Sequence, residues 1–313
     1  MKGHAKSNLL LLMTAIIWGS AFIAQSKGAD VIGPFTFNTV RYALAVVALL
    51  PVIYIFSRKK ERDEVSADKE VQNTCIHQDH KTLIIGGIAT GLALFTASSL
   101  QQYAMAFTTA AKAGFITTLY VILVPIVGIF LKKKIRPIIW LCALLAVIGL
   151  YLLSIQPGTF SISRGDFFVL LCALAFTGHI LIIDYFSPKT DGVKLSCIQF
   201  AVVSVASFFA MMLTETFVLS EVLDAVIPLL YTGVLSSSVG YTCQIIAQKK
   251  ADPVISSLIL SLESVFAAVF GALILHENMS GREITGCVIM FAAIIIAQLP
   301  EKKNRRLSDD TLQ

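Results

Sequence analysis

Long apolar segments separated by short polar connectors dominate the chain. A transmembrane helix needs about 20 mostly apolar residues, and ten segments of this kind can be marked along the sequence. They run approximately from Asn8 to Ser26, Phe35 to Phe56, Thr82 to Tyr103, Ala111 to Leu131, Pro137 to Ser154, Asp166 to Phe186, Lys194 to Leu213, Leu223 to Ala247, Pro253 to Leu275 and Gly281 to Leu299. The pattern predicts an all-α polytopic membrane protein with ten transmembrane helices and almost no extramembrane domain.

The composition favours the same class of protein. Hydrophobic residues make up 56% of the 313 residues, charged residues only 14%, and the mean hydropathy is +0.78, whereas soluble proteins carry about 25% charged residues. Five of the six cysteines fall inside apolar segments without paired spacing, so we interpret them as small buried hydrophobic residues. Intrinsic disorder, a disulfide scaffold and a conventional nucleic-acid binder are excluded.

The basic residues are distributed by membrane side. With the N-terminus inside, 20 of the 25 Lys and Arg residues fall in cytoplasmic connectors or termini, and only Arg41 lies well inside a span, away from its ends. Because Lys and Arg are enriched in cytoplasmic connectors, this predicts an even number of spans with both termini in the cytoplasm. The connector 57–81 and the tail 300–313 are predicted to be cytoplasmic and solvated.

A faint internal repeat divides the chain into two five-helix halves, 8–154 and 166–299. A shift of 158 residues aligns the first two spans of each half, and a shift of 142 aligns the third spans. The aligned pairs are Ala15 with Ala173, Trp18 with Phe176, Arg41 with Gln199, Gly91 with Gly233 and Gln102 with Gln244. Because five is odd, the second half must be inverted relative to the first, an arrangement typical of secondary transporters, whose halves rock around a midplane site.

Four motifs carry a resemblance to a known family. They are Trp18-Gly19-Ser20-Ala21-Phe22, Arg41-Tyr42, Gln101-Gln102-Tyr103 followed by Thr108 to Pro125, and Ser261-Leu262-Glu263-Ser264-Val265-Phe266-Ala267-Ala268 running to His276-Glu277. In their order and duplication they resemble the two EamA modules of the drug/metabolite transporter superfamily. The resemblance implies a prokaryotic inner-membrane exporter or importer of small metabolites with a central cavity. One departure is Phe176-Thr177-Gly178-His179, which replaces the tryptophan-bearing pattern in the second half.

Two charged residues, Glu263 and Arg41, lie well away from the ends of their predicted spans, where a charge costs about 2.5–3.5 kcal/mol on insertion scales. Glu263 is the deepest acid, about ten residues into the ninth span. One interpretation is functional: Glu263 relays a proton or cation, or provides the counter-charge for an amine substrate. The other is structural: Glu263 is an acid paired with Arg41 or with helix backbone. Arg41 is predicted to be a structural charge rather than a substrate contact.

Polar side chains also align on single faces of three predicted helices. At 100° per residue, Ser237, Tyr241 and Gln244 share one face of the eighth span, and comparable faces occur on the first and third spans. Such faces avoid lipid, and either bond between helices or line a wet cavity. The predicted substrate-binding residues are Trp18, Gln102, His179, Ser237, Tyr241, Ser257 and Glu263.

Sequence patterns for other chemistry are weak. Cys75, His77 and His80 lack a fourth ligand and lie in a charged connector, so no metal site is predicted. The sequence has no phosphate loop and no nucleophile motif, so we expect neither an enzyme nor a cofactor. The prediction is a secondary transporter whose partners are a small-molecule substrate, the lipid bilayer and a coupling proton or cation, acting as a monomer or homodimer. A channel and a non-transporting membrane scaffold or sensor are the alternatives.

Overall fold

The computed structural model describes residues 2–66, 80–108, 110–132, 135–154, 163–274 and 280–299, and every regular element within these ranges is helical. Cys75, His77, the central part of the predicted connector 57–81 and the predicted tail 300–313 lie outside the described residues.

Sixteen helical elements follow one another along the described chain. The first half contains α1 (Lys2–Ala29), α2 (Pro34–Ser66), α3 (His80–Ala104), α4 (Ala110–Thr117), α5 (Tyr120–Phe130) and α6 (Pro137–Ser154). The second half contains α7 (Arg164–Phe186), the short turn η2 (Ser187–Lys189), α8 (Gly192–Thr214), α9 (Leu219–Asp224), α10 (Val226–Leu230), the π-helical segment η3 (Tyr231–Tyr241), α11 (Thr242–Gln248), α12 (Pro253–Leu260), α13 (Glu263–Ile274) and α14 (Gly281–Gln298).

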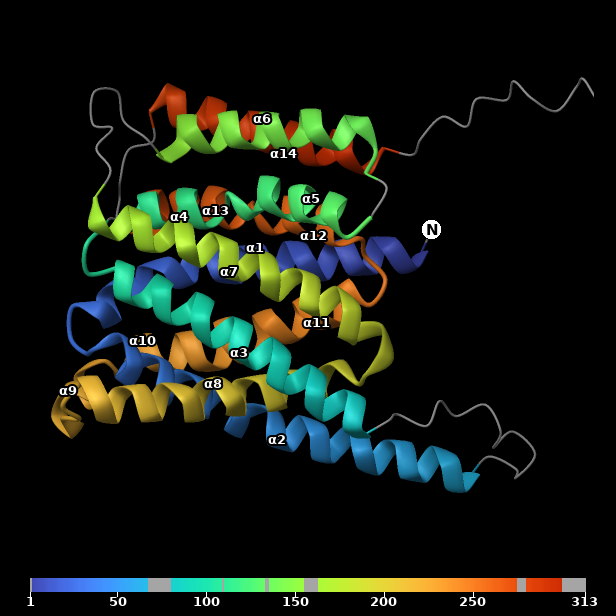
Figure 1. The fold of residues 1–313 in the computed structure, drawn as a ribbon, viewed down its shortest axis with the longest axis vertical. Helices are drawn as coiled ribbons and strands as arrows, with labels where there is room; N and C mark the ends of the chain where they lie inside the picture. The colour runs from blue at the N-terminus through green and yellow to red at the C-terminus, as the bar shows by residue number, and fades with distance from the viewer. Residues whose placement is uncertain are drawn as a thin grey trace, which may run out of the picture.

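The protein is an all-helical, multi-pass membrane protein. Eight helical segments of the described chain are long and apolar enough to cross a bilayer. Two further apolar helices, α6 and α14, are the last helices of the two halves. They pack side by side at one edge of the bundle (Figure 1). Large apolar side chains such as Leu213 and Phe130 are exposed on the outside, where a bilayer would cover them.

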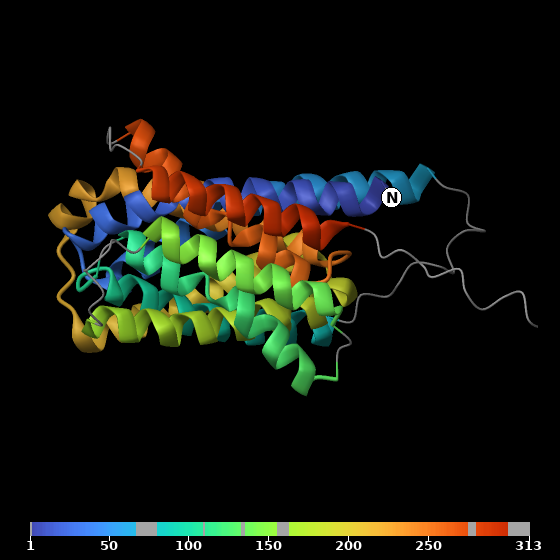
Figure 2. The same ribbon diagram turned by 90° about the horizontal axis from the view of Figure 1, so that it is seen from above.

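The two halves pack in a reciprocal way. α1 packs against η3–α11 and α13, and its counterpart α7 packs against α3 and α4–α5. α2 packs against its own counterpart α8. Figure 1 shows α1 beginning at the end of the bundle marked N and α7 beginning at the opposite end, so equivalent helices run in opposite directions. Figure 2 shows the helices running along a common direction, with the end of α2 at the same end as the N-terminus.

The structure corrects three predicted spans. α2 continues to Ser66 rather than ending at Phe56, so part of the predicted connector is helical. The fourth and ninth spans are each broken in the middle, into α4–α5 and α12–α13. At the breaks the hydroxyls of Thr118 and Ser261 donate to the carbonyls of Gly114 and Leu258. There they compete with the backbone N–H groups that would donate to these carbonyls in a regular helix. Several backbone hydrogen bonds there join residues three apart, as in a 3₁₀-helix, rather than four apart, as in an α-helix.

Candidate functional site: a central polar cavity

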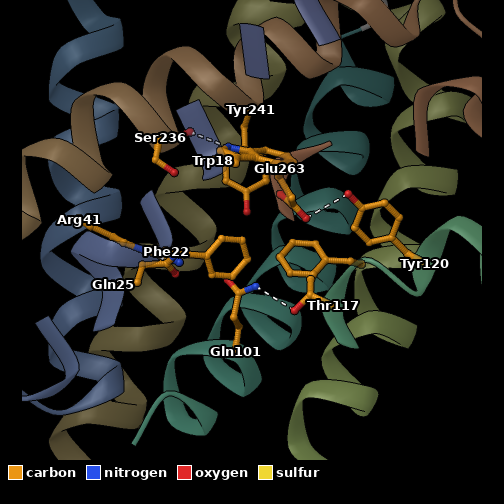
Figure 3. Close-up of a pocket in the computed structure, with 11 residues that line it drawn as sticks. Trp18, Phe22, Gln25, Arg41, Gln101, Thr117, Tyr120, Ser236, Tyr241 and Glu263 are labelled. Carbon is orange, nitrogen blue, oxygen red and sulfur yellow. Dashed lines mark hydrogen bonds between the residues drawn. The ribbon is translucent and has the colours of Figure 1, made fainter. Parts of the chain in front are cut away.

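A small cavity lies inside the bundle, between the two halves. Its volume is ≈ 30 Å³, which is enough to hold ordered water but well below the roughly 300–1,000 Å³ of small-molecule sites. Helices α1, α2, α3, α5, α7 and α13 and segment η3 contribute to its wall, as does the end of α4 (Figure 3). The lining residues are Trp18, Phe22, Gln25, Arg41, Gln101, Thr117, Tyr120, Phe176, Ser236, Tyr241 and Glu263.

Glu263 is positioned by the break in the ninth span. It is the first residue of α13, directly after the break at Ser261 and Leu262. The Tyr120 hydroxyl donates a hydrogen bond to Glu263 Oε1 at 3.1 Å, and the Glu263 side chain is only 4% exposed. Within the described chain Glu263 forms no ion pair with Arg41, so the predicted structural pairing of these two charges is absent.

The two helix breaks meet beside this carboxyl. Thr118 Oγ1 and Ser264 Oγ lie 3.3 Å apart, and Ser264 also donates to the Gly114 carbonyl at 3.2 Å. Tyr120 and Glu263 each begin the second half of their broken span. They are therefore equivalent positions in the two halves and bond to each other, which places their contact near the axis that relates the halves.

Arg41 forms the second charged part of the cavity wall. It is 3% exposed and donates to Gln25 Oε1 and to the Tyr42 hydroxyl, both at 3.0 Å. Its guanidinium carbon lies 4.6 Å from the centre of the Tyr42 ring and 5.5 Å from that of Phe37. Arg41 Nε is buried without a hydrogen-bond partner, so the charge is held by polar groups and ring faces rather than by a carboxylate.

An aromatic wall faces these charges. The rings of Trp18 and Tyr241 pack with centroids 4.6 Å apart, and Trp18 Nε1 donates to the Ser236 carbonyl at 3.1 Å. This close approach needs Gly240, because a Cβ there would lie 2.6 Å from Trp18 Nε1. Ser236, Gly240 and Tyr241 belong to the π-helical η3, a rare geometry that occurs frequently at functional sites.

The structure separates the predicted substrate-binding residues into groups. Trp18, Tyr241 and Glu263 line the cavity together. His179 lies behind the aromatic wall, with its ring 5.8 Å from that of Tyr241 and its Nε2 3.1 Å from Gln199 Oε1. Ser257 instead donates to a carbonyl of its own helix.

Ser237 and Gln102 are buried but lie elsewhere. Ser237 is in η3 and does not line the central cavity, and its hydroxyl has no hydrogen-bond partner. Gln102 lines a second cavity of ≈ 280 Å³ near the α1–α2 turn, together with Asp30 and Tyr103. It also donates to the Gln25 carbonyl at 3.1 Å, and Gln25 lines the central cavity. The predicted polar faces are buried, so the prediction that they avoid lipid is confirmed.

Several lining residues were not predicted from the sequence. They are Phe22, Gln25, Gln101, Thr117, Tyr120, Phe176 and Ser236. Gln25 lies on the predicted polar face of the first span, so that periodicity could have identified it. Tyr120 could have been found by aligning the fourth and ninth spans, because it occupies the position equivalent to Glu263. The others carry no polar periodicity that distinguishes them from packing residues.

The cavity combines a buried guanidinium and a buried carboxyl group with an aromatic wall, an arrangement suited to binding a small polar solute. Among the described residues, no group of three or more His, Cys, Asp or Glu side chains is placed to hold a metal ion.

Known proteins match this chain along most of its length. The sequence profile of the EamA-like transporter family matches twice, over residues 5–155 and 163–298. A protein of Archaeoglobus fulgidus named as an uncharacterized transporter is 30% identical over 94% of this chain and 86% of its own length. A similarly named protein of Clostridium kluyveri is 25% identical over 95% and 94% of the two chains.

A solved crystal structure has the same fold. It superposes with a TM-score of 0.73 at 15% sequence identity, and the match covers 94% of this chain and 96% of that chain. The names of family and relatives indicate a transporter rather than an enzyme. The chain belongs to the EamA-like transporter family, of the drug/metabolite transporter superfamily.

Proposed function

We propose that the protein is a secondary transporter that moves a small metabolite across the cytoplasmic membrane by alternating access. The substrate is an amino acid or another small organic solute, drugs included. The observation that carries the proposal is the cavity between the two halves, where Arg41 and Glu263 are buried without an ion pair. Intramembrane charges are costly and typically mark substrate or ion pathways.

The cavity size supports a mechanism with more than one conformation. A volume of ≈ 30 Å³ is too small for an organic solute, so the helices around it must separate for substrate to enter. The reciprocal packing of the two halves is compatible with a second arrangement in which one half has rocked against the other. The larger cavity at the α1–α2 turn, joined to the centre through Gln102 and Gln25, would serve as an access route.

The proposed orientation has both termini in the cytoplasm. The predicted cytoplasmic connectors, which carry most of the Lys and Arg residues, follow helix ends that lie at the end of the bundle marked N (Figure 1). The positive-inside rule then assigns this end to the cytoplasm. Transport is proposed to be driven by a coupling proton or cation, and ten spans allow a monomer or a homodimer to act.

Glu263 is proposed as the coupling or charge-recognition residue. Replacing it by the neutral isostere, Glu263→Gln, should abolish the pH dependence of transport and leave membrane insertion intact. The control is Glu221→Gln, which neutralises an exposed acid on α9. Normal flux with unchanged pH dependence in Glu263→Gln would contradict the role.

The test of transport is solute counterflow in proteoliposomes. Purified protein is reconstituted, and vesicles loaded with candidate amino acids, amines and organic acids are exposed to trace labelled solute outside. A carrier gives transient accumulation above equilibrium that saturates with solute. The alternative channel function predicts continuous ohmic conductance in planar bilayers, and a scaffold or sensor predicts no flux in either assay.

A further inference from the structure

The larger cavity, of ≈ 280 Å³, lies between two segments of the first half that form its lips. One lip is the α1–α2 turn, residues 29–34, and the other is the end of α3 with the connector that follows, residues 102–107. We infer that two carboxylates of the second half, those of Glu215 and Asp166, anchor these two lips and hold them apart. The inference rests on the proposed access route through this cavity and assigns the residues that keep that route open.

Glu215 anchors the α1–α2 turn by capping α2. This helix begins with Pro34, which has no N–H, so its first free N–H groups are those of Phe35 and Thr36. They donate to Glu215 Oε1 and Oε2, each at 2.8 Å, and Thr36 Oγ1 donates to Oε2 at 2.6 Å. Gly33 leaves room for the carboxylate, because a Cβ there would lie 2.5 Å from Oε2 and 2.7 Å from Oε1. Glu215 does not line the cavity, so it holds this lip from behind.

Asp166 anchors the connector after α3. Thr108 Oγ1 donates to Asp166 Oδ1 at 2.6 Å, and Asp166 is only 7% exposed. The backbones approach closely here, because a Cβ at Gly165 would lie 2.9 Å from the Phe107 carbonyl carbon and 3.0 Å from its oxygen. The Arg164 guanidinium carbon lies 5.7 Å from the centre of the Phe107 ring. Three successive residues of α7 thus hold the second lip, and they too lie outside the cavity lining.

The corresponding helix starts of the second half are capped by their own side chains. The shift of 158 residues that aligns the second spans pairs Gly33 with Asp191. Asp191 Oδ1 accepts hydrogen bonds from the N–H groups of Val193 and Lys194 at the start of α8, and Asp252 likewise caps α12. Gly33 has no side chain that could cap α2. A cap from the opposite half therefore distinguishes the α1–α2 turn from its counterpart.

Both lips belong to the first half and both anchors to the second. Figure 1 shows α9, which begins at Leu219 shortly after Glu215, at the end of the bundle opposite the one marked N. The proposed orientation makes this end extracellular. Because both bonds cross between the halves, rocking of one half against the other must either carry the lips along or break the bonds. The two carboxylates therefore tie the width of the cavity to the arrangement of the halves.

The test measures how readily the two lips meet. In a full-length parent whose six native cysteines are replaced by alanine, Val31→Cys and Ala106→Cys place one thiol on each lip. A disulfide needs the two Cα atoms within about 4.4–6.8 Å, so the rate of crosslinking in membrane vesicles, with copper–phenanthroline as oxidant, reports closure of the cavity. We expect slow crosslinking in the parent. Removal of either anchor should accelerate it about tenfold or more, as expected for the loss of a charge-assisted hydrogen bond.

Two variants remove the anchors without deleting a carboxylate. Gly33→Ala displaces the carboxylate that caps α2, and Thr108→Val removes the hydroxyl that donates to α7 while keeping the shape of the side chain. Thr108→Ser keeps the hydroxyl and should restore slow crosslinking. The matched controls are Gly281→Ala, whose added Cβ meets no atom within 4 Å, and Thr214→Val, whose hydroxyl bonds within its own helix. Both controls should crosslink at the parent rate.

Each anchor is refuted by its own variant. Unchanged or slower crosslinking in Gly33→Ala would overturn the role of Glu215, and the same result in Thr108→Val would overturn that of Asp166. Immediate crosslinking in the parent, or equal acceleration in the controls, would overturn both, because the lips would then not be held apart by these bonds. Counterflow reads the transport proposal separately: accelerated crosslinking without counterflow of any solute by the wild type would support the anchors and refute the carrier.

Discussion

Gly19 is the position where a single added methyl group should disturb the cavity most directly. A Cβ at this position would lie 2.6 Å from the Glu263 carbonyl oxygen, 2.6 Å from Phe266 Cβ and 2.8 Å from the Ala267 nitrogen. Ordinary van der Waals contact begins near 3.4 Å. Because two of these atoms belong to the α13 backbone, Gly19→Ala must push α1 and α13 apart rather than move a side chain.

The loss of stability caused by this steric overlap can be separated from the general effect of replacing Gly by Ala in a helix by comparison with a second glycine. Overpacking of this kind costs about 1–3 kcal/mol, and Ala gains about 0.5–1 kcal/mol over Gly in a helix. Gly178, within α7, has no atom within 4 Å of its added Cβ, so Gly178→Ala shows the helix gain alone. We expect the free energy of unfolding of Gly19→Ala to be about 1–3 kcal/mol below that of Gly178→Ala.

The assay is denaturation of the purified variants in mixed detergent micelles, followed by helical circular dichroism. Counterflow on the same preparations should also fall for Gly19→Ala, because separation of α1 from α13 moves Trp18 relative to Glu263. If Gly19→Ala is as stable as Gly178→Ala and transports normally, the tight contact between α1 and α13 does not exist as described. The reasoning from backbone proximity would then be refuted.

Two further predictions concern single hydrogen-bonding groups. Glu215 accepts bonds from the backbone N–H groups of Phe35 and Thr36 at the start of α2, so Glu215→Ala should lower the free energy of unfolding by about 1.5–3 kcal/mol, whereas Glu221→Ala should not. Tyr120→Phe removes the hydroxyl that donates a hydrogen bond to Glu263. It should change the pH profile of transport, measured as the initial rate between about pH 5 and 9. An unchanged profile would contradict a role for this hydrogen bond.

The helical architecture was predictable because it depends on averages over many residues. Twenty apolar residues in a row can satisfy their backbone in a bilayer only as a helix, and the distribution of Lys and Arg predicted an even number of spans. The breaks in the fourth and ninth spans were not predictable in this way. A Thr or a Ser inside an apolar run, such as Thr118 or Ser261, does not reveal whether its hydroxyl bends the helix or simply bonds within it.

The site was predictable only where the residue type itself is unusual in a membrane. Glu263 and Trp18 stand out by charge or size, and the structure places both at the cavity. His179 is equally unusual, yet it lies behind Tyr241 because its direction depends on how α7 packs against its neighbours. Arg41 was predicted as a structural charge, and its cavity position depends on the contact between α1 and α2 made by Gln25.

The duplicated architecture explains how one scaffold holds two different ionisable residues, Arg41 and Glu263. The positions equivalent to Arg41 and Glu263 in the opposite halves are Gln199 and Tyr120, which are neutral. The repeat therefore supplies matched helix breaks and matched packing, while one half contributes the cation and the other the acid. Rocking of the halves would change the distance between Arg41 and Glu263, because the two residues belong to different halves. A solute that contacts both residues at once would favour one distance over another, and that difference in binding is what couples a ligand to a conformational change.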